Sequence, residues 1–277
     1  MNDIANVETW SGKDRKDENF PVGSRLIRPK LRVHVHAFYN FARNADDIAD
    51  SPTLTPEDKL ARLDVMEAVL LGRSDDGSPS ALALRDSLAK TRVTPVHATE
   101  LLIAFRLDAT KQRYTTLTEL YEYCRYSAAP VGRYVLDLHR ESHKTHAPSD
   151  ALCSALQILN HLQDCAVDLK TLDRCYLPED LLAEFGSGTG DLRKRAMTPG
   201  LRKVFDSLLH RVERMTRFAS ELPPRTRDRR LRLETAVIVG LAKRLANRLA
   251  RQDPLAAPVK LTKRDFVTST LVALRHL

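Results

Sequence analysis

Apolar residues recur at helical spacing through most of the chain. Leucine, alanine and valine return every three or four positions with charged side chains between them, and no alternation of useful length predicts a strand. The pattern predicts an all-α fold of about ten helices. Their expected ranges are 29–50, 56–72, 79–91, 95–112, 116–140, 148–170, 177–185, 198–221, 228–252 and 262–276.

Capping residues support several of the expected helix starts. Thr55 precedes Pro56, Ser78 precedes Pro79, Thr116 precedes Glu119 by three residues, and Ser149 precedes Asp150, which are arrangements that satisfy the free amides of a first turn. The helices are expected to form one domain over residues 20–277. A polar segment over residues 1–19 precedes it and is expected to be poorly ordered, or ordered only by a ligand.

Composition narrows the class of protein. Of the 277 residues 43% are hydrophobic and 29% charged, which excludes disordered and fibrous proteins, and the 10 glycines are too few for a turn-rich β protein. No stretch approaches the ~20 apolar residues of a membrane span. The N-terminus also lacks the apolar core of a secretory signal, so a cytoplasmic protein is expected.

The net charge of +8 is unevenly distributed. It is −5 over residues 1–190 and +11 over residues 191–252. The basic block has few interleaved aromatic residues and no recognition motif, so nucleic-acid binding is disfavoured. Clustered Lys and Arg can instead attract a protein to an anionic membrane surface, and peripheral membrane contact is the interpretation that we retain for this block.

Two pairs of aspartates suggest a metal site. Asp46 and Asp50 are four residues apart on one predicted helix, and Asp164 and Asp168 are four apart on another. Such neighbours repel each other, so helix stability does not explain them, whereas Mg²⁺ prefers carboxylate oxygens and often bridges them to phosphates. Facing each other across a bundle, the two pairs would hold a metal cluster against a diphosphate. The alternative at the first pair is a solvated acidic helix end.

A third segment interrupts an otherwise good helix. The small residues Ser127, Ala128 and Ala129 are followed by Pro130 and Gly132, which predicts a kink. The kink could leave room for a bulky ligand chain or permit close helix–helix packing, and the residues alone do not separate these alternatives. His139, His143 and His146 also follow helical spacing, but they straddle a helix end, where a solvated polar surface is favoured over a zinc site.

Four motifs together resemble the squalene/phytoene synthase family of trans-isoprenyl-diphosphate enzymes, over about residues 18–250. In chain order they are A-x-Y-x-F-x-R-x-x-D-D-x-x-D at 37–50, Y-C-x-x-x-A-x-x-V-G at 123–132, Q-x-x-N-x-x-x-D-x-x-x-D at 157–168 and R-x-Y-L-P at 174–178. Within the family, the segments F-R-L-D-A-T-K at 105–111 and N-H-L-Q-D-C at 160–165 most resemble the bacterial hydroxysqualene synthases of hopanoid biosynthesis. The chain departs from many family members at Asn19, Gln163 and Asp173.

The resemblance implies an isoprenoid-synthase-type helical bundle around a central cavity, and an enzyme that converts presqualene diphosphate and water to hydroxysqualene and diphosphate. It implies Mg²⁺ held by Asp46, Asp50, Asp164 and Asp168, with Tyr123 as a further catalytic residue. The implied substrate-binding residues are Arg43, Asp47, Lys111, Arg113, Gln157, Asn160, Phe20 and Tyr39.

Two other functions remain open at this point. One is a related synthase that condenses two prenyl diphosphates to presqualene diphosphate, squalene or phytoene, because all of these enzymes share the aspartate motifs. The other is a non-catalytic member of the family. Such a protein would be expected to lose the metal aspartates, and this chain keeps all four.

Overall fold

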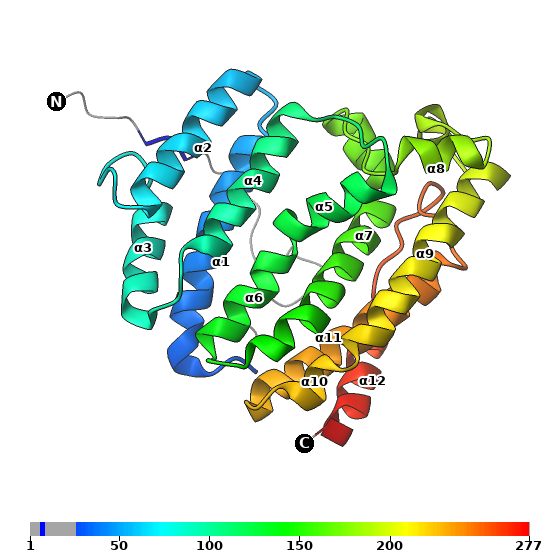
Figure 1. The fold of residues 1–277 in the computed structure, drawn as a ribbon. Helices are drawn as coiled ribbons and strands as arrows, with labels where there is room; N and C mark the ends of the chain where they lie inside the picture. Colours follow the sequence, from blue (N-terminus) through cyan, green and yellow to red (C-terminus); the bar gives the residue numbers. More distant parts are fainter. Residues whose placement is uncertain (1–5, 9–25, 277) are drawn as a thin grey trace. The chain divides into compact units, whose positions relative to one another are not determined.

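The computed structural model describes residues 6–8 and 26–276, and the regular elements of that part of the chain are all helices (Figure 1). In chain order they are α1 (Pro29–Ala49), α2 (Pro56–Leu70), α3 (Pro79–Thr91), α4 (Val96–Thr110), α5 (Leu117–Ser127), α6 (Ala129–Leu138), η1 (His143–Thr145), α7 (His146–Thr171), α8 (Glu179–Glu184), η2 (Thr189–Arg193), α9 (Pro199–Ala219), α10 (Leu222–Arg225), α11 (Arg229–Leu249), α12 (Lys263–Ala273) and η3 (Leu274–His276).

The all-α class is confirmed, but the expected single helix over 116–140 is wrong. The chain forms α5 and α6, which are separated at Ala128 (φ −120°, ψ −48°). Pro130 has no amide hydrogen to donate and its ring would clash with the carbonyl four residues earlier, so α5 cannot continue through it. The same residue is tolerated in the first turn of the new helix α6.

Most of the expected caps are present. The side chains of Thr55, Ser78 and Thr116 each accept a hydrogen bond from an amide in the first turn of α2, α3 and α5. The cap expected at Ser149 is wrong, because α7 begins three residues earlier, at His146. Ser149 is therefore a buried residue of the first turn of α7.

The chain divides into two compact units. Unit 1 comprises residues 1–110 and 133–141, and unit 2 comprises residues 111–132 and 142–277. In unit 1 the helices α1 to α4 enclose a core that includes Phe41, Met66 and Leu102. Tyr134 completes this core, where its ring stacks on Phe38 at 4.0 Å between centroids.

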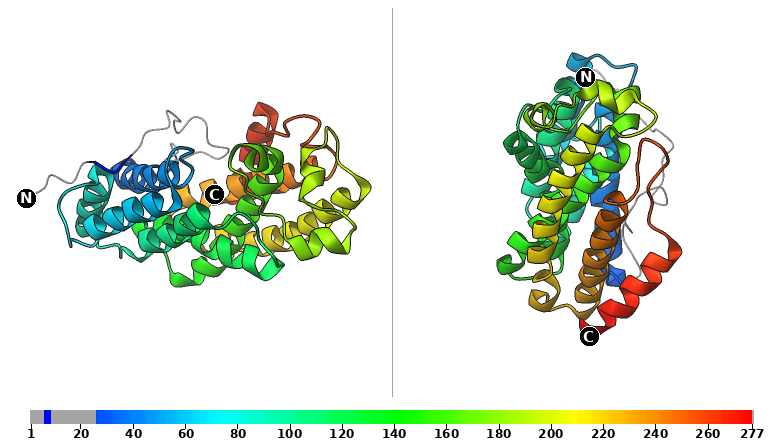
Figure 2. Two further views of the ribbon diagram at one scale, coloured as in Figure 1. Left: turned by 90° about the horizontal axis from the view of Figure 1, so that it is seen from above. Right: turned by 90° about the vertical axis from the view of Figure 1, so that its right-hand side faces the viewer.

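Unit 2 is built on the long helix α7. It packs against α5, α9 and α11, and α11 packs in turn against α9, α10 and α12. Figure 2 shows α12 lying against α11. Ile158, Phe205 and Leu245 are among the fully buried side chains that hold these helices together.

Residues 6–8 belong to the polar segment expected over 1–19, and they contact unit 1. The carboxylate of Glu8 accepts hydrogen bonds from Ser78 Oγ (2.6 Å), Ser80 N (2.7 Å) and Ser80 Oγ (2.6 Å). These donors lie at the N-terminus of α3, where a negative charge is favoured by the helix dipole. Glu8 therefore joins this short segment to α3.

No helix in the described part of the chain is long and apolar enough to cross a membrane.

Candidate functional site

One face of α1 carries the first acidic motif. Tyr39, Arg43, Asp46 and Asp50 are spaced three and four residues apart, so they share this face, and all four are half-buried. Between them and the core of unit 1 lies the apolar side of the same helix, which includes Ala45 and Ile48. The burial of that apolar side fixes the rotation of α1 and therefore the direction of the acidic face.

Arg43 is already paired with this motif. Its guanidinium lies 2.7 Å from Asp47 Oδ1 and 3.2 Å from Asp46 Oδ2. The side chain of Asp47 is only 7% exposed, so this ion pair compensates a nearly buried charge. In this structure Arg43 thus supports the carboxylates, and the binding of substrate by Arg43 stays a prediction.

The carboxylates around Asp46 repel one another. Burial and the nearby carboxylate of Asp50 raise the pKa of Asp46 to about 8, with Asp108 and Asp47 adding to the rise and Arg43 opposing it. A divalent cation would relieve this repulsion, and carboxylate oxygens are the ligands that Mg²⁺ prefers. The donor set on α1 therefore fits a magnesium site.

Asp108 is a residue of this cluster that the sequence analysis did not assign. It lies on α4 of unit 1, is almost fully buried, and contributes to the raised pKa of Asp46. The available signal was its place in the segment at 105–111, which carried part of the family resemblance.

The second acidic motif follows one face of α7 in unit 2. Its polar residues are spaced three and four positions apart, as the sequence predicted. The side chain of Asp164 is exposed, whereas those of Gln157, Asn160 and Asp168 are half-buried. The neighbouring positions Leu159 and Leu162 are fully buried, and they anchor α7 in the core of unit 2.

An aromatic cluster lies beside this face within unit 2. The His161 ring stacks on Tyr176 at 3.7 Å between centroids, and the Tyr123 ring lies 5.0 Å from Tyr176. The hydroxyl groups of Tyr123 and Tyr176 are 3.3 Å apart, and Arg174 donates to the Tyr176 hydroxyl at 3.1 Å. Tyr114 stacks on Tyr176 from another direction at 5.4 Å. The structure therefore places the expected catalytic Tyr123 in a buried aromatic cluster.

His161 is neutral in this cluster. Burial and, to a smaller extent, the charge of Arg174 lower its pKa to about 3. Its Nε2 lies 3.3 Å from the Gln157 amide nitrogen, which can only donate, so Nε2 accepts and the ring proton lies on Nδ1. No role was predicted for His161 or Tyr176 from the sequence, although both lie in segments that carried the resemblance.

Two of the three cations expected to bind the diphosphate, Lys111 and Arg113, are held by acidic partners in unit 2. Lys111 pairs with Glu119 at 2.9 Å and lies over the ring of Tyr114. Arg113 pairs with Asp173 Oδ1 at 2.8 Å and also donates to the Asp173 carbonyl oxygen. Asp173 has a positive φ of 51°, a conformation that favours glycine, and its backbone is held there by these bonds.

The break between α5 and α6 is a place of close packing. A Cβ atom on Gly132 would lie 2.4 Å from Ser149 Oγ and 2.7 Å from Cys153 Sγ, so glycine allows α7 to approach here. This observation favours helix packing over room for a ligand at position 132. Ser127, at the end of α5, has a buried hydroxyl group without a hydrogen-bond partner in the structure.

Phe20 and Tyr39 are the remaining residues expected to bind substrate. Phe20 lies outside the described residues. Tyr39 is half-buried on the acidic face of α1, one turn before Arg43.

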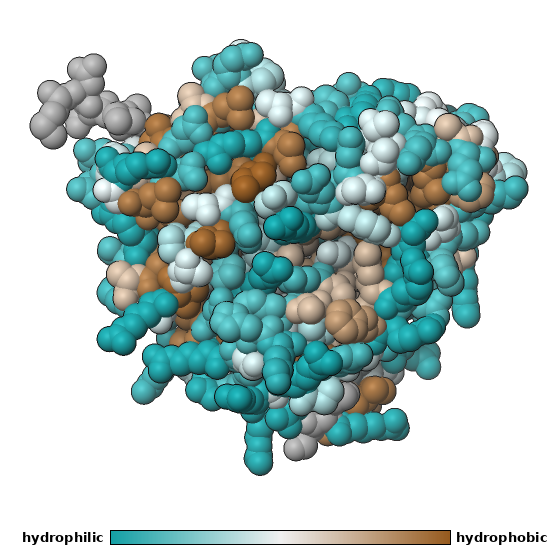
Figure 3. Space-filling model, in the orientation of Figure 1, coloured by the Kyte–Doolittle hydropathy of each residue, from teal (hydrophilic) through white to brown (hydrophobic). Residues whose placement is uncertain are grey.

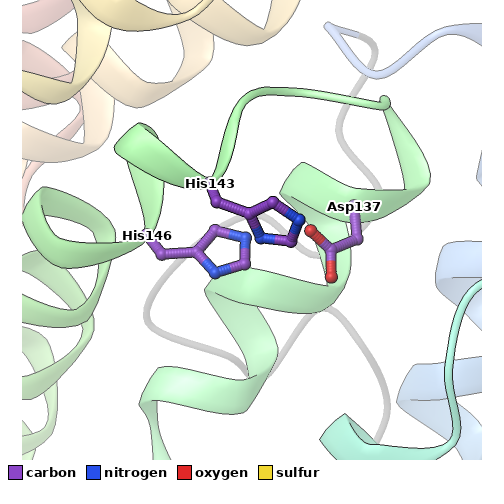
Figure 4. A group of neighbouring side chains, drawn as sticks. All are labelled: Asp137, His143 and His146. Atoms are coloured by element: carbon purple, nitrogen blue, oxygen red, sulfur yellow. The ribbon is translucent and has the colours of Figure 1, made fainter.

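Of the three histidines considered for a zinc site, His143 and His146 lie beside each other near the start of α7. His143 and His146 have their rings in edge-to-face contact at 4.8 Å (Figure 4). His139 instead bonds to the carbonyl of Val135 at 2.8 Å, and Asp137 is bound to His97 at 2.7 Å within unit 1. Structural zinc takes four ligands, so this pair of imidazoles is insufficient by itself.

Solved structures with similar folds identify the class of protein. A squalene synthase HpnC from Alicyclobacillus acidocaldarius matches with a TM-score of 0.75 and 30% identity, covering 86% of this chain and 90% of that one. A dehydrosqualene synthase matches with a TM-score of 0.79 at 22% identity, covering 94% and 92% of the two chains. The fold is that of the isoprenoid synthases.

Sequence comparison is more specific. The family model for squalene/phytoene synthase matches residues 13–265. A hydroxysqualene synthase of Rhodopseudomonas palustris is 46% identical over 267 residues, covering 96% of this chain and 91% of the relative. A second hydroxysqualene synthase, of Sinorhizobium fredii, is 43% identical over 252 residues, with coverages of 91% and 86%. The chain belongs to the squalene/phytoene synthase family.

Proposed function

We propose that this protein is an enzyme that converts presqualene diphosphate and water to hydroxysqualene and diphosphate, and that the reaction depends on Mg²⁺. The observation that carries the proposal is the 46% identity to a hydroxysqualene synthase along nearly the whole chain. The retention of both aspartate pairs favours a catalytic member over a non-catalytic one.

The metal would be held by carboxylates of both motifs. The proposed metal ligands are Asp46 and Asp50 of unit 1 and Asp164 and Asp168 of unit 2. Bound Mg²⁺ would supply stabilisation of the charge that develops on the departing diphosphate. The repulsion around Asp46 supports this assignment, because it disfavours the ionised carboxylates unless a cation is present.

Other residues would bind and orient the substrate. Lys111 and Arg113 are cations that could exchange their carboxylate partners for diphosphate oxygens, with Arg43 maintaining the acidic motif. Gln157 and Asn160 would orient the diphosphate or the water from α7, and Tyr123 would act from the aromatic cluster. That cluster is nearly free of solvent, which would protect a carbocation from early capture.

The test is product analysis with purified protein. Presqualene diphosphate and Mg²⁺ should yield hydroxysqualene and one equivalent of diphosphate, and a chelator should stop the reaction until Mg²⁺ is restored. Asp46→Asn and Asp164→Asn should each lower turnover by roughly a hundredfold or more, as expected when charge stabilisation in a transition state is lost.

Matched controls are available on both units. Asp64 of α2 and Asp206 of α9 are exposed aspartates outside both motifs, and Asp64→Asn and Asp206→Asn should leave turnover close to that of the original protein. Turnover that survives both motif substitutions would refute the assignment of the metal site. Presqualene diphosphate left unchanged by the original protein in the presence of Mg²⁺ would refute the proposed reaction itself.

A second candidate is a synthase that condenses two farnesyl diphosphates. It is favoured by the similarity to the solved structure described as a squalene synthase, at 30% identity. Incubation with farnesyl diphosphate alone separates the two candidates, because only the second would form a product with thirty carbons from it.

A further inference from the structure

Helix α12 has its apolar side turned outward. Val267, Leu271 and Leu274 are spaced four and three residues apart, so they form one stripe along α12 and η3, which we call the α12 apolar face. These side chains are 58%, 61% and 47% exposed. A helix that packs on a protein core normally buries such a stripe.

The opposite side of α12 explains this orientation. Asp265, Ser269 and Ala273 form the buried stripe, and they face α11. Arg248 bonds to Asp265 at 2.7 Å and Arg244 bonds to Ser269 at 3.0 Å. A polar and small stripe is thus buried through specific hydrogen bonds.

Gly240 of α11 makes the close approach possible. A Cβ atom there would lie 3.1 Å from Ser269 Oγ and 3.2 Å from its Cβ, so a larger residue would separate the two helices. The inward side of α12 is therefore shaped to fit α11. The outward direction of the apolar face follows from this fit.

Positive charge surrounds the α12 apolar face. Lys263 and Arg264 begin the helix, Arg275 follows it, and all three are exposed. Asp265 is the only acidic residue between positions 260 and 277, and it is turned inward to Arg248. Figure 3 shows hydrophobic and hydrophilic surface side by side at the bottom of the view, where Figure 1 places α12.

We propose that the α12 apolar face inserts into an anionic lipid bilayer, with Lys263, Arg264 and Arg275 contacting the head groups. An amphipathic helix with apolar residues on one side and Lys or Arg beside them binds in the membrane interface. Each cation near an anionic surface adds to the attraction. A second copy of the chain fits less well, because two such faces would bring cations together in any symmetric contact.

The basic charge of α11 extends this surface. Lys243 is exposed on α11, and Arg251 and Lys260 are exposed in the segment that leads from α11 to α12. Long-range attraction by these residues would bring the protein to the bilayer, and insertion of the α12 apolar face would retain it there. Binding should therefore need both anionic lipid and apolar contact.

Vesicle binding tests the proposal with the full chain. Vesicles of phosphatidylcholine with phosphatidylglycerol should bind the protein, whereas phosphatidylcholine alone should bind it weakly. The double variant V267S/L271S should bind the anionic vesicles at least roughly tenfold more weakly, because its apolar contact is lost. The variant K263E/R264E should weaken binding to a similar extent, and added salt should weaken binding of the original protein.

Exposed residues of α1 provide matched controls. Val33 is 63% exposed and Lys30 is exposed, so V33S and K30E make the same chemical changes on another helix. Both should bind like the original protein. Since α12 lies outside the proposed site, V267S/L271S should keep its turnover of presqualene diphosphate in detergent, which separates this test from that of the proposed function.

Three results would overturn the proposal. One is no binding of the original protein to anionic vesicles. Another is binding that V267S/L271S leaves unchanged. The third is a dimer in sedimentation that V267S/L271S dissociates while vesicle binding is absent, which would assign the face to a second copy.

Discussion

At the scale of single residues, the protein places ionisable groups where their ordinary charge is unfavourable. Asp46 lies among other carboxylates on α1 and α4, and His161 is enclosed by tyrosine rings and Gln157. Groups with strongly shifted pKa values often mark functional sites, because burial and nearby charges at such sites adjust pKa values to the task of the site. Both residues lie in or beside the motifs that identify the family.

Asp46 should lower the stability of the metal-free protein. Its pKa is about 8 in the folded state and near 3.8 in the unfolded state, so stability is lost as the pH rises between these values. Asp46→Asn should therefore raise the free energy of unfolding at about pH 8 by on the order of 1 kcal/mol, reduced by solvent screening because a third of the side chain is exposed. Denaturant titrations without Mg²⁺ at about pH 4 and pH 8 measure this gain.

The gain should shrink toward pH 4, because the carboxyl group is protonated in the folded state there and no longer repels its neighbours. Asp64→Asn, at an exposed ion pair on α2, serves as the control. The stability difference between this variant and the original protein should not grow in this way from pH 4 to pH 8. A variant Asp46→Asn that is less stable than the original protein at pH 8 would contradict the repulsion around this residue.

His161 should produce the opposite dependence on pH. Its pKa is lowered to about 3 in the folded state from 6.5, so the unfolded state binds a proton first and stability falls as the pH drops below 6.5. Between about pH 7.5 and pH 5.5 the loss should be about 1 kcal/mol, since one pKa unit corresponds to ~1.4 kcal/mol. His161→Phe keeps a ring against Tyr176 but cannot titrate, so its stability should change less over this range.

His210→Gln is the control for this experiment, because His210 is an exposed histidine of α9. It should retain the full pH dependence of the original protein in denaturant titrations. If the free energy of unfolding changes equally with pH in His161→Phe and in the original protein, the buried imidazole is not the group responsible.

At the scale of elements, small residues decide how closely helices approach. Gly132 permits contact between α6 and α7, and Gly240 permits contact between α11 and α12. In each pair the helix opposite the glycine has a serine at the contact: Ser149 on α7 and Ser269 on α12. The cost of a methyl group at these positions depends on whether those side chains can move aside.

Gly132→Ala should lower the free energy of unfolding by about 1–2 kcal/mol, because the new Cβ would overlap Ser149 Oγ and Cys153 Sγ. Part of this loss should be recovered when Gly132→Ala is combined with Ser149→Ala and Cys153→Ala. Denaturant titrations of the single and combined variants give the coupling energy.

Gly188→Ala is the matched control, since its Cβ would meet open space and its φ of −157° suits any residue. It should change the stability little. If the loss of stability in the combined variant equals the sum of the losses from its separate substitutions, Gly132 does not act through the close approach of α7.

At the scale of the whole molecule, acidic and basic residues are concentrated in different parts of the chain. The acidic first part of the chain contains both aspartate pairs, and the basic block lies on α9, α11 and the segments around them. The net charge of +8 therefore describes neither region. We propose that the acidic residues bind a metal and that the basic residues guide the protein to lipid. An apolar product would be released into that lipid.

Much of the fold could be predicted because helices depend on local pattern. The expected ranges 56–72 and 79–91 match α2 and α3 closely, and the caps at Thr55 and Ser78 are present. The start of α7 and the division at Ala128 were missed. Several residues could serve as a cap, and a proline can either bend a helix or begin a new one, so the neighbouring helices decide between these outcomes.

The candidate site was predictable only in part for the same reason. Spacing of three and four residues places Asp46 with Asp50 and Asp164 with Asp168, because both pairs follow from the geometry of one helix. Asp108 and Tyr176 are distant in sequence from the groups that they affect. No local pattern shows that Asp108 acts on Asp46 or that Tyr176 stacks on His161.

The sequence by itself determined the all-α class, the family and the residues of the two acidic faces, because each depends on the order of residues within a single helix or motif. The tertiary structure decided the contents of the aromatic cluster, the role of Gly132 and the orientation of α12. The pattern of α12 alone would bury Val267 and Leu271, yet Arg244 and Arg248 hold its polar stripe against α11. Only the packing of neighbouring helices determines which side of a helix faces solvent.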